Sequence, residues 1–223
     1  MCGIVAVTGY RKALPLLING LEKLEYRGYD SAGIAVISPS DEELICEKSE
    51  GKLINLINKV KDNDISGTVG IGHTRWATHG KPEVRNAHPH LDSFGKVAVV
   101  QNGIITNAEN IIESEEVDTG EIENDTIAIA ALLTKWTQSK RLSDLENIFS
   151  QLQGEYSIIA ASIYGEVLLR TNVGNLYTTE APDGHIQVAS EPRQFNKDLK
   201  DRCQRVPLNK TVFLRSPSME ESV

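Results

Sequence analysis

The sequence lacks several features that each mark a class of protein. No run of Lys and Arg is longer than a pair, and 31 acidic residues outnumber 23 basic ones, which leaves a net charge of −8. Nucleic-acid binding requires clustered positive charge, so no nucleic-acid partner is expected. No apolar stretch is long enough to cross a bilayer, and the N-terminus has no signal-peptide pattern. These absences predict a cytoplasmic, globular protein without a membrane partner.

Cysteine is scarce, with single residues at Cys2, Cys46 and Cys203. An odd number of widely separated cysteines without a CxxC pair disfavours both a disulfide framework and a zinc site. Four of the five histidines fall in one window, at His73, His79, His88 and His90. Their spacing matches no familiar zinc pattern, and no nearby Cys or paired carboxylate joins them. Neither a metal nor another cofactor is therefore expected.

Apolar periodicity predicts strands near both ends of the chain and helices between them. The expected strands are 2–7, 32–37, 68–73, 96–101, 155–164, 166–171, 185–190 and 211–215, and the expected helices are 11–28, 52–61, 124–139 and 143–154. A capping box of Ser143 and Glu146 is expected to open the last helix. This grouping favours a layered α+β architecture over repeated βαβ units, in a single domain that spans residues 1–223.

The chain opens with MCGIV, which places a cysteine next to the initiator methionine. A small second residue permits removal of Met1, and Cys2 would then carry a free α-amine and a thiol. With unperturbed pKa values of about 8 and 8.5, the amine can serve as the base for its own side chain. The alternative is that Cys2 is a small apolar residue of the first buried strand.

Two charged residues could hold a small zwitterion. Arg75 lies in the loop GHTRWATHG, residues 72–80, where its guanidinium could clamp a carboxylate or simply face solvent. Asp125 lies where the helix DTIAIA begins, and it could cap that helix or meet an ammonium group. If both bind one ligand, that ligand is a free α-amino acid.

The stretch QNG, residues 101–103, stands between two apolar runs. Asn-Gly in this setting predicts a β-hairpin with a type I′ turn. The Asn102 amide and the Gly103 N–H could also form a two-donor pocket for a developing oxyanion. A tight turn would fix both donors, so the two interpretations are compatible.

Five motifs together resemble the glutaminase domain of class II glutamine amidotransferases. They are MCGIV, EYRGYDSAG at 25–33, GHTRWATHG, NAHPH at 86–90 and NGII at 102–105. EYRGYDSAG and TRWATHG resemble the glucosamine-6-phosphate synthase branch in particular. The resemblance implies the N-terminal nucleophile (Ntn) hydrolase fold, a four-layer αββα sandwich.

The same resemblance assigns a role to individual residues. It makes Cys2 the nucleophile, with its freed amine as base, and Asn102 and Gly103 the oxyanion hole. Arg75 and Asp125 would bind the charged ends of L-glutamine. The implied supporting residues are Thr78, His79 and His88 lining the site, Trp76 on the loop that covers it, and Arg27 beside the N-terminal residue. The implied reaction passes through a glutamyl thioester and yields ammonia and glutamate.

The chain also departs from its relatives. Gln101 stands where they commonly carry His, NVGNLY at 172–177 replaces an expected Gly-Ser-Pro-Leu loop, and Glu191-Pro192 stands where an aspartate is usual. We expect no sugar isomerase domain of the synthase within residues 1–223. We therefore expect the ammonia acceptor, fructose-6-phosphate, on a missing domain or a partner subunit, through which a homodimer would form.

Two alternatives belong to other functional classes. The chain could bind glutamine as a sensor without turnover, given Gln101 and the absent acceptor half. It could also be an Ntn hydrolase that acts on a different amide. Measured turnover separates the first alternative from a glutaminase, and competition among amide substrates separates the second.

Overall fold

Two antiparallel sheets form the centre of the molecule. The computed structural model describes residues 2–76, 82–139 and 141–215. The first sheet has the strand order β11-β9-β10-β1-β4-β2-β3. Its strands are β1 (Gly3–Thr8), β2 (Ser31–Ser38), β3 (Glu43–Glu50), β4 (Val69–Arg75), β9 (Tyr177–Glu180), β10 (Ile186–Ala189) and β11 (Gln204–Arg205). Strand β1, which follows Cys2, therefore lies inside the sheet between β10 and β4.

The second sheet has five strands in the order β12-β8-β7-β6-β5. Its strands are β5 (His90–Leu91), β6 (Val97–Ile105), β7 (Gly154–Ser162), β8 (Glu166–Thr171) and β12 (Val212–Arg215). Every neighbouring pair is antiparallel. The long central strands β6 and β7 run side by side over nine residue pairs.

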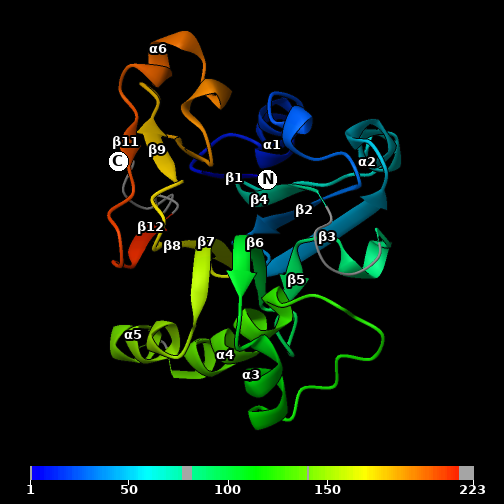
Figure 1. Ribbon diagram of the computed structural model, residues 1–223. Coiled ribbons are helices and arrows are strands. Elements are labelled where there is room, and N and C mark those ends of the chain that lie inside the picture. Colours follow the sequence, from blue (N-terminus) through cyan, green and yellow to red (C-terminus); the bar gives the residue numbers. More distant parts are fainter. Residues whose placement is uncertain (1, 77–81, 140, 216–223) are drawn as a thin grey trace.

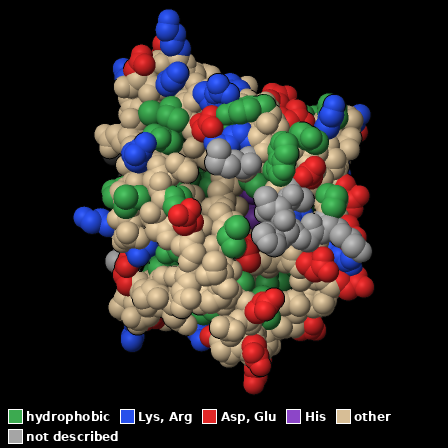
Figure 2. Space-filling view, in the orientation of Figure 1, with side chains coloured by type: hydrophobic (Ala, Val, Ile, Leu, Met, Phe, Trp, Pro, Cys, Tyr) green, Lys and Arg blue, Asp and Glu red, His purple; other side chains and the backbone are tan. Residues whose placement is uncertain are grey.

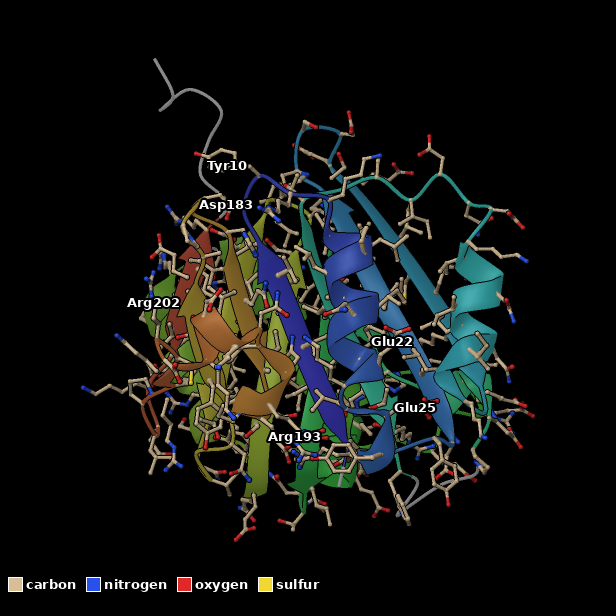
Figure 3. The ribbon with its side chains drawn as sticks, turned by 90° about the horizontal axis from the view of Figure 1, so that it is seen from above. Tyr10, Glu22, Glu25, Asp183, Arg193 and Arg202 are labelled. Atoms are coloured by element: carbon tan, nitrogen blue, oxygen red, sulfur yellow. The ribbon has the colours of Figure 1, made fainter. Side chains whose placement is uncertain are left out.

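Helices cover the outer face of each sheet (Figure 1). On the first sheet lie α1 (Ala13–Glu22) and α2 (Leu53–Val60), which are seen from above in Figure 3. On the second lie α3 (Ala108–Ser114), α4 (Thr126–Ser139) and α5 (Leu142–Ser150). Shorter elements are α6 (Lys197–Lys200) and the 3-10 turns η1 (Glu25–Arg27), η2 (Val84–Asn86) and η3 (Pro192–Gln194). None of the described helices is long and apolar enough to span a membrane.

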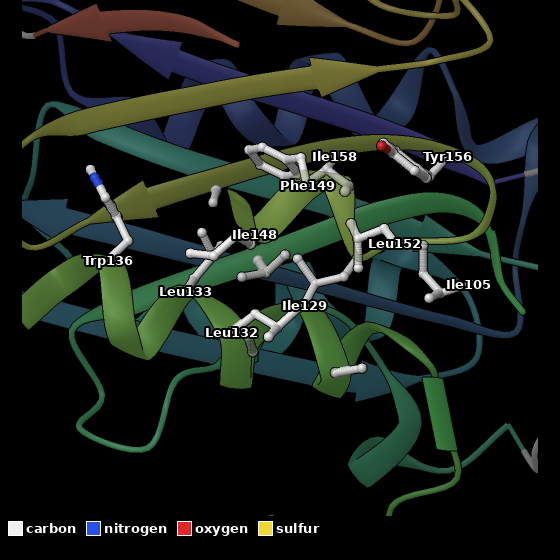
Figure 4. Packing of buried hydrophobic residues seen from close by; sticks show 14 of the residues in the cluster. Ile105, Ile129, Leu132, Leu133, Trp136, Ile148, Phe149, Leu152, Tyr156 and Ile158 are labelled. Carbon is white, nitrogen blue, oxygen red and sulfur yellow. The ribbon is translucent and has the colours of Figure 1, made fainter. Parts of the chain in front are cut away.

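Three apolar clusters separate these layers, and strand alternation explains them. Along β1, Ile4 and Ala6 face the space between the sheets, whereas Val5 and Val7 face α1. The third cluster lies between the second sheet and its helices, where Leu133 of α4 is fully buried (Figure 4). Because β1 is buried on both faces, its sequence is a continuous apolar run.

Glycines in β4 allow α1 to approach the first sheet. A Cβ atom at Gly70 would lie 2.6 Å from Cδ1 of Leu17, and one at Gly72 would lie 3.0 Å from Cδ1 of Leu21. Leu17 and Leu21 are one helical turn apart, so the same face of α1 meets both glycines. The alternation in VGIGH therefore directs Val69 and Ile71 into the space between the sheets and presents Gly70 and Gly72 to α1.

The predicted Asn-Gly hairpin is wrong. Strand β6 continues through Asn102 and Gly103, which pair with Ser157 and Tyr156 of β7. Gly103 has a φ of 130°, and a Cβ atom there would lie 1.9 Å from the carbonyl oxygen of Glu155. The glycine therefore serves a close approach between two strand backbones, not a turn.

Some predicted helix ends are also wrong. Helix α5 begins at Leu142, after Arg141, with no side-chain cap, so the Ser143–Glu146 capping box does not form. Glu146 instead accepts hydrogen bonds from Arg170 at 3.1 Å and from Thr211 at 2.7 Å. The expected helix 11–28 ends at Glu22, and η1 continues the chain toward β2.

Candidate active site

A cavity of about 890 Å³ collects most of the predicted site residues. Its lining includes Cys2, Arg75, Trp76, His88, Gly103 and Asp125. Figure 2 shows a hollow near the middle of the molecular face, with a histidine side chain at its base. Thr78 and His79 lie outside the described residues. The cavity therefore brings together side chains that are far apart in the sequence.

Strand pairing fixes the position of Cys2. The Ile4 N–H donates to the Ser190 hydroxyl at 3.2 Å, and the Ser190 N–H donates to the Ile4 carbonyl at 3.0 Å. On the other side Gly3 pairs with Thr74 of β4. A Cβ atom at Gly3 would lie 2.7 Å from Cβ of Leu24, so only glycine fits after the cysteine. These contacts place Cys2 beside the end of β4, where Arg75 and Trp76 follow.

The Cys2 thiol contacts the backbone of Trp76. The Trp76 N–H donates to Sγ at 3.3 Å, and Sγ lies 3.7 Å from the Trp76 carbonyl oxygen. Burial raises the pKa of the thiol, and the Trp76 N–H and the charges of Arg75 and Arg27 oppose that effect in part. A thiol with a raised pKa is protonated at neutral pH, so it needs a base to act as a nucleophile.

Asn102 lies directly next to the first residues of the chain. Its Nδ2 donates to the carbonyl oxygen of Cys2 at 2.9 Å. Gly103, the next residue of β6, lines the cavity. The two predicted oxyanion donors are thus adjacent to the predicted nucleophile, although β6 presents them as part of a strand and not a turn.

Arg75, the last residue of β4, and Asp125, which immediately precedes α4, line the same cavity. Burial lowers the pKa of Arg75, and the nearby charges of Cys2, Asp30 and Asp125 oppose this effect. The Asp125 carboxylate accepts the Ile105 N–H at 2.6 Å, which ties it to the end of β6. A guanidinium and a carboxylate in one cavity can bind the two charged groups of an α-amino acid.

Asn124, which the sequence analysis did not single out, makes the bond expected of a helix cap. Its Oδ1 accepts the Thr126 N–H at 2.9 Å, where α4 begins. Because Asn124 satisfies that N–H, the neighbouring Asp125 can point its carboxylate toward β6 and the cavity. The adjacent polar residues in the stretch NDT were the only sequence signal for this arrangement.

His88 connects β6 to the start of α4. The Gln101 N–H donates to Nδ1 of His88 at 3.3 Å. Nε2 lies 3.2 Å from Oδ1 of Asn124 and 3.2 Å from Oγ1 of Thr126. Thr126 Oγ1 in turn donates to Oε1 of Gln101 at 3.1 Å. Gln101 thereby links β6 to His88 and to the start of α4.

Three buried histidines pack against one another below the cavity. The ring centroids of His73 and His88 are 4.1 Å apart, and those of His88 and His90 are 5.1 Å apart. Burial lowers the pKa of His73 to about 3 and holds the pKa values of the other two well below the usual range. Among the residues that the structure describes, no group of His, Cys, Asp and Glu side chains is arranged to hold a metal ion.

Comparison with known proteins identifies the relatives of the chain. No family model matches it. A glutamine–fructose-6-phosphate aminotransferase (isomerizing) of Thermosynechococcus vestitus is 48% identical over 166 residues, which is 71% of this chain and 26% of the relative. A protein of the same name from Gloeobacter violaceus is 61% identical over 108 residues, which is 48% of this chain and 17% of the relative. The chain is a homologue of the class II glutamine amidotransferases.

Solved amidotransferase structures confirm the predicted fold. The glutamine phosphoribosylpyrophosphate amidotransferase of B. subtilis matches with a TM-score of 0.77 and 23% identity, over 96% of this chain and 47% of that chain. The allosteric regulatory enzyme of purine biosynthesis matches with a TM-score of 0.79 and 24% identity over the same shares. The chain therefore has the Ntn hydrolase fold, with its αββα layers. It spans about a quarter of the length of the first curated relative, at 26%.

Proposed function

We propose that this chain hydrolyses the side-chain amide of L-glutamine to glutamate and ammonia. The observation that carries the proposal is that the Cys2 thiol, Arg75 and Asp125 line one cavity, with Asn102 bonded to the Cys2 carbonyl. This reaction requires a nucleophile, an oxyanion donor and two oppositely charged groups that bind an α-amino acid. The sequence relatives support the same reaction, because their name includes glutamine as a substrate.

The proposed reaction starts after removal of Met1. The freed α-amine of Cys2 takes the thiol proton while sulfur attacks the side-chain carbonyl carbon of glutamine. Negative charge on the carbonyl oxygen is stabilised by Nδ2 of Asn102 and the N–H of Gly103. The C–N bond then breaks, the α-ammonium returns the proton to the leaving ammonia, and a thioester remains. Water attacks that thioester with the amine again as base, which releases glutamate and restores the thiol.

The other predicted residues would support this chemistry. His88 would line the site through its bonds with Gln101 and Asn124, and Arg27 would hold the region around Cys2. Trp76, which is 44% exposed, would cover the bound substrate, whereas Thr78 and His79 would line the site. Since no metal or cofactor is required by these steps, the residues of the chain itself would carry the whole glutaminase reaction.

The ammonia would pass to an acceptor site outside residues 1–223. Residues 1–223 themselves would form one glutaminase domain of the cytoplasmic enzyme. The relatives' name supports fructose-6-phosphate as the acceptor, with glucosamine-6-phosphate as the product. Ammonia in bulk water at neutral pH is mostly protonated and does not react as a nucleophile, so the acceptor must lie on an adjoining domain or subunit. A homodimer would form through that acceptor part.

The test begins with the N-terminus and the thiol. Intact-mass measurement should show loss of Met1, and treatment with an electrophilic glutamine analogue should add one label at Cys2. The Cys2→Ala variant should lose glutamate release at least about 1,000-fold, whereas Cys46→Ala should retain it. Glutamate release by Cys2→Ala would refute the proposal. Glutamine binding without turnover in Met1-free protein would instead favour the sensor, and faster turnover of another amide would favour a different hydrolase.

A further inference from the structure

Glu191 lies close to the N-terminus although it is distant in the sequence. It follows Ser190, whose N–H and hydroxyl bond both backbone groups of Ile4. The chain then enters η3 at Pro192. Because Ser190 is fixed against β1 by two hydrogen bonds, the Glu191 backbone is held at the same end of β1 as Cys2.

The Glu191 carboxylate joins three side chains. Its Oε1 lies 2.5 Å from Nη1 of Arg27, and its Oε2 accepts the Tyr26 hydroxyl at 2.5 Å. Nε of Arg193 lies 3.5 Å from the same Oε2, and the Arg193 guanidinium lies 4.6 Å from the centre of the Tyr26 ring. Figure 3 shows Arg193 and Glu25 at the same edge of the molecule, where η1 meets the segment after β10.

Arg27 is the member of this cluster that depends on Glu191 most. The Arg27 side chain is 7% exposed, whereas that of Arg193 is 56% exposed. A carboxylate bonded to a buried guanidinium stabilises its charge, and loss of that carboxylate removes this stabilisation. Removal of the Glu191 charge therefore weakens the electrostatic hold on Arg27, which η1 carries.

The η1 turn also supports the backbone that contacts the thiol. Gly28, which ends the turn, packs so closely on Arg75 and Trp76 that a Cβ atom would lie 2.5 Å from the Arg75 carbonyl carbon. The Asp30 N–H donates to the Arg75 carbonyl oxygen at 3.0 Å. A shift of η1 would thus disturb the Trp76 N–H, which donates to Sγ of Cys2.

We infer that Glu191 is a positioning residue for the Cys2 nucleophile and acts through Arg27 and the η1 turn. The inference rests on the proposed function, because Cys2 acts as a nucleophile only in the proposed glutaminase reaction. Among the described residues, the charged groups that act on the thiol are Arg27 from η1 and Arg75 from β4. Of these, only Arg27 is bonded to Glu191 in the described structure.

The experiment compares Glu191→Gln with Glu191→Asp and with Glu166→Gln. The first variant removes the charge and keeps the side-chain size, and the second keeps the charge. The third breaks the bond of Glu166 with Arg215 at the edge of the second sheet, which makes it a matched ion-pair control. Two readouts are measured on folded, Met1-free protein: kcat and KM for glutamine, and the pH dependence of iodoacetamide labelling of Cys2, followed by peptide mass spectrometry.

For Glu191→Gln we expect kcat to fall by about tenfold or more with KM changed less than about threefold, which is the pattern of a disturbed reacting group. The labelling profile of Cys2 should move to higher pH, because the positive charge near the thiol is displaced. Glu191→Asp should restore part of both effects. The double variant with Arg27→Ala should be no worse than Arg27→Ala alone, since both changes act through one contact.

The inference is overturned when Glu191→Gln matches Glu166→Gln in kcat and in the labelling profile. It is also overturned when Glu191→Gln lowers only thermal stability and leaves the labelling profile unchanged. Failure of the proposed function looks different: wild-type protein then releases no glutamate. In that case the labelling shift alone decides whether Glu191 positions the thiol.

Discussion

At the scale of single residues, the nucleophile and its base determine how the site works. The Cys2 thiol has a raised pKa because it is buried, so little thiolate exists at neutral pH. Within the described residues, the Trp76 N–H donates to Sγ, and a backbone N–H cannot remove a proton. The three histidines nearby are held neutral by burial, and His88 uses both ring nitrogens for structural bonds. The proposed base is therefore the α-amine that Cys2 would carry after removal of Met1.

This assignment predicts the pH dependence of glutamine hydrolysis. An α-amine has an unperturbed pKa of about 8, and it is a base only when deprotonated. We therefore expect kcat/KM to fall by about tenfold per pH unit as the pH decreases below that value. Steady-state rates of glutamate release between pH 5 and 8 provide the measurement. A rate that stays flat across this range would exclude the amine as the base.

Residue chemistry also explains which site residues could be predicted from sequence. Cys2, Arg75 and Asp125 were recognisable because their chemical types and their motifs pointed to one ligand. Asn124 and Thr126 were not, because a helix cap and a threonine have ordinary structural roles in any sequence. Their contribution depends on contacts with His88 and Gln101, which lie 36 and 25 residues away in the chain.

At the scale of secondary-structure elements, β6 shows where local sequence patterns fail. Asn-Gly is a strong turn signal when only neighbouring residues are considered. Here the β7 backbone lies beside both residues and keeps them extended. Strand β3 could not be predicted from its sequence pattern. Its burial is intermediate over six residues, and ELICEKSE lacks a clear alternation of apolar and polar residues. By contrast β8, which is buried over five consecutive residues, was predicted with its observed bounds.

The close approach at Gly103 predicts a large effect of Gly103→Ala. The new Cβ atom would overlap the Glu155 carbonyl oxygen at 1.9 Å, and the φ of 130° is strained for alanine. We expect the free energy of unfolding to fall by about 3 kcal/mol or more, with loss of glutaminase activity. Gly120→Ala is a matched control, because its φ is 54° and nothing lies within 4 Å of the added atom.

The control should cost only the backbone strain of about 1 kcal/mol. Urea unfolding of the two variants and the wild type measures the difference. Equal destabilisation by both substitutions would show that backbone strain, and not the contact with β7, determines the need for glycine at position 103. It would also remove the structural explanation for the continuous β6 strand.

At the scale of the whole molecule, both sheets contribute to the proposed site. Arg75 ends β4 of the first sheet, and Cys2 immediately precedes β1. Asn102 and Gly103 lie in β6 of the second sheet, and Asp125 immediately precedes α4. The apolar layer between the sheets therefore sets the distance across the site. The layered α+β class could be predicted from the order of elements, but this pairing of strand ends could not, since it depends on the packing of the two sheets.

Burial of His73, His88 and His90 makes the stability of the fold sensitive to acid. In the unfolded chain each histidine has a pKa of about 6.5. In the folded protein the pKa of His73 is about 3, and those of His88 and His90 are also well below the usual range. Below pH 6.5 the unfolded state therefore binds more protons than the folded state, so acid favours unfolding. Above pH 6.5 all three are neutral in both states, and this effect disappears.

Between pH 6.5 and 5 each of these histidines should reduce the free energy of unfolding with a limiting slope of about 1.4 kcal/mol per pH unit. The three together would approach about 4 kcal/mol per unit, before carboxylate titration becomes large. Urea titrations at half-unit pH steps measure the slope. His90, unlike His73 and His88, is not among the residues that line the cavity, and His90→Gln should lower the slope by about a third. A stability that does not change between pH 7 and 5 would show that the histidines accept protons in the folded protein.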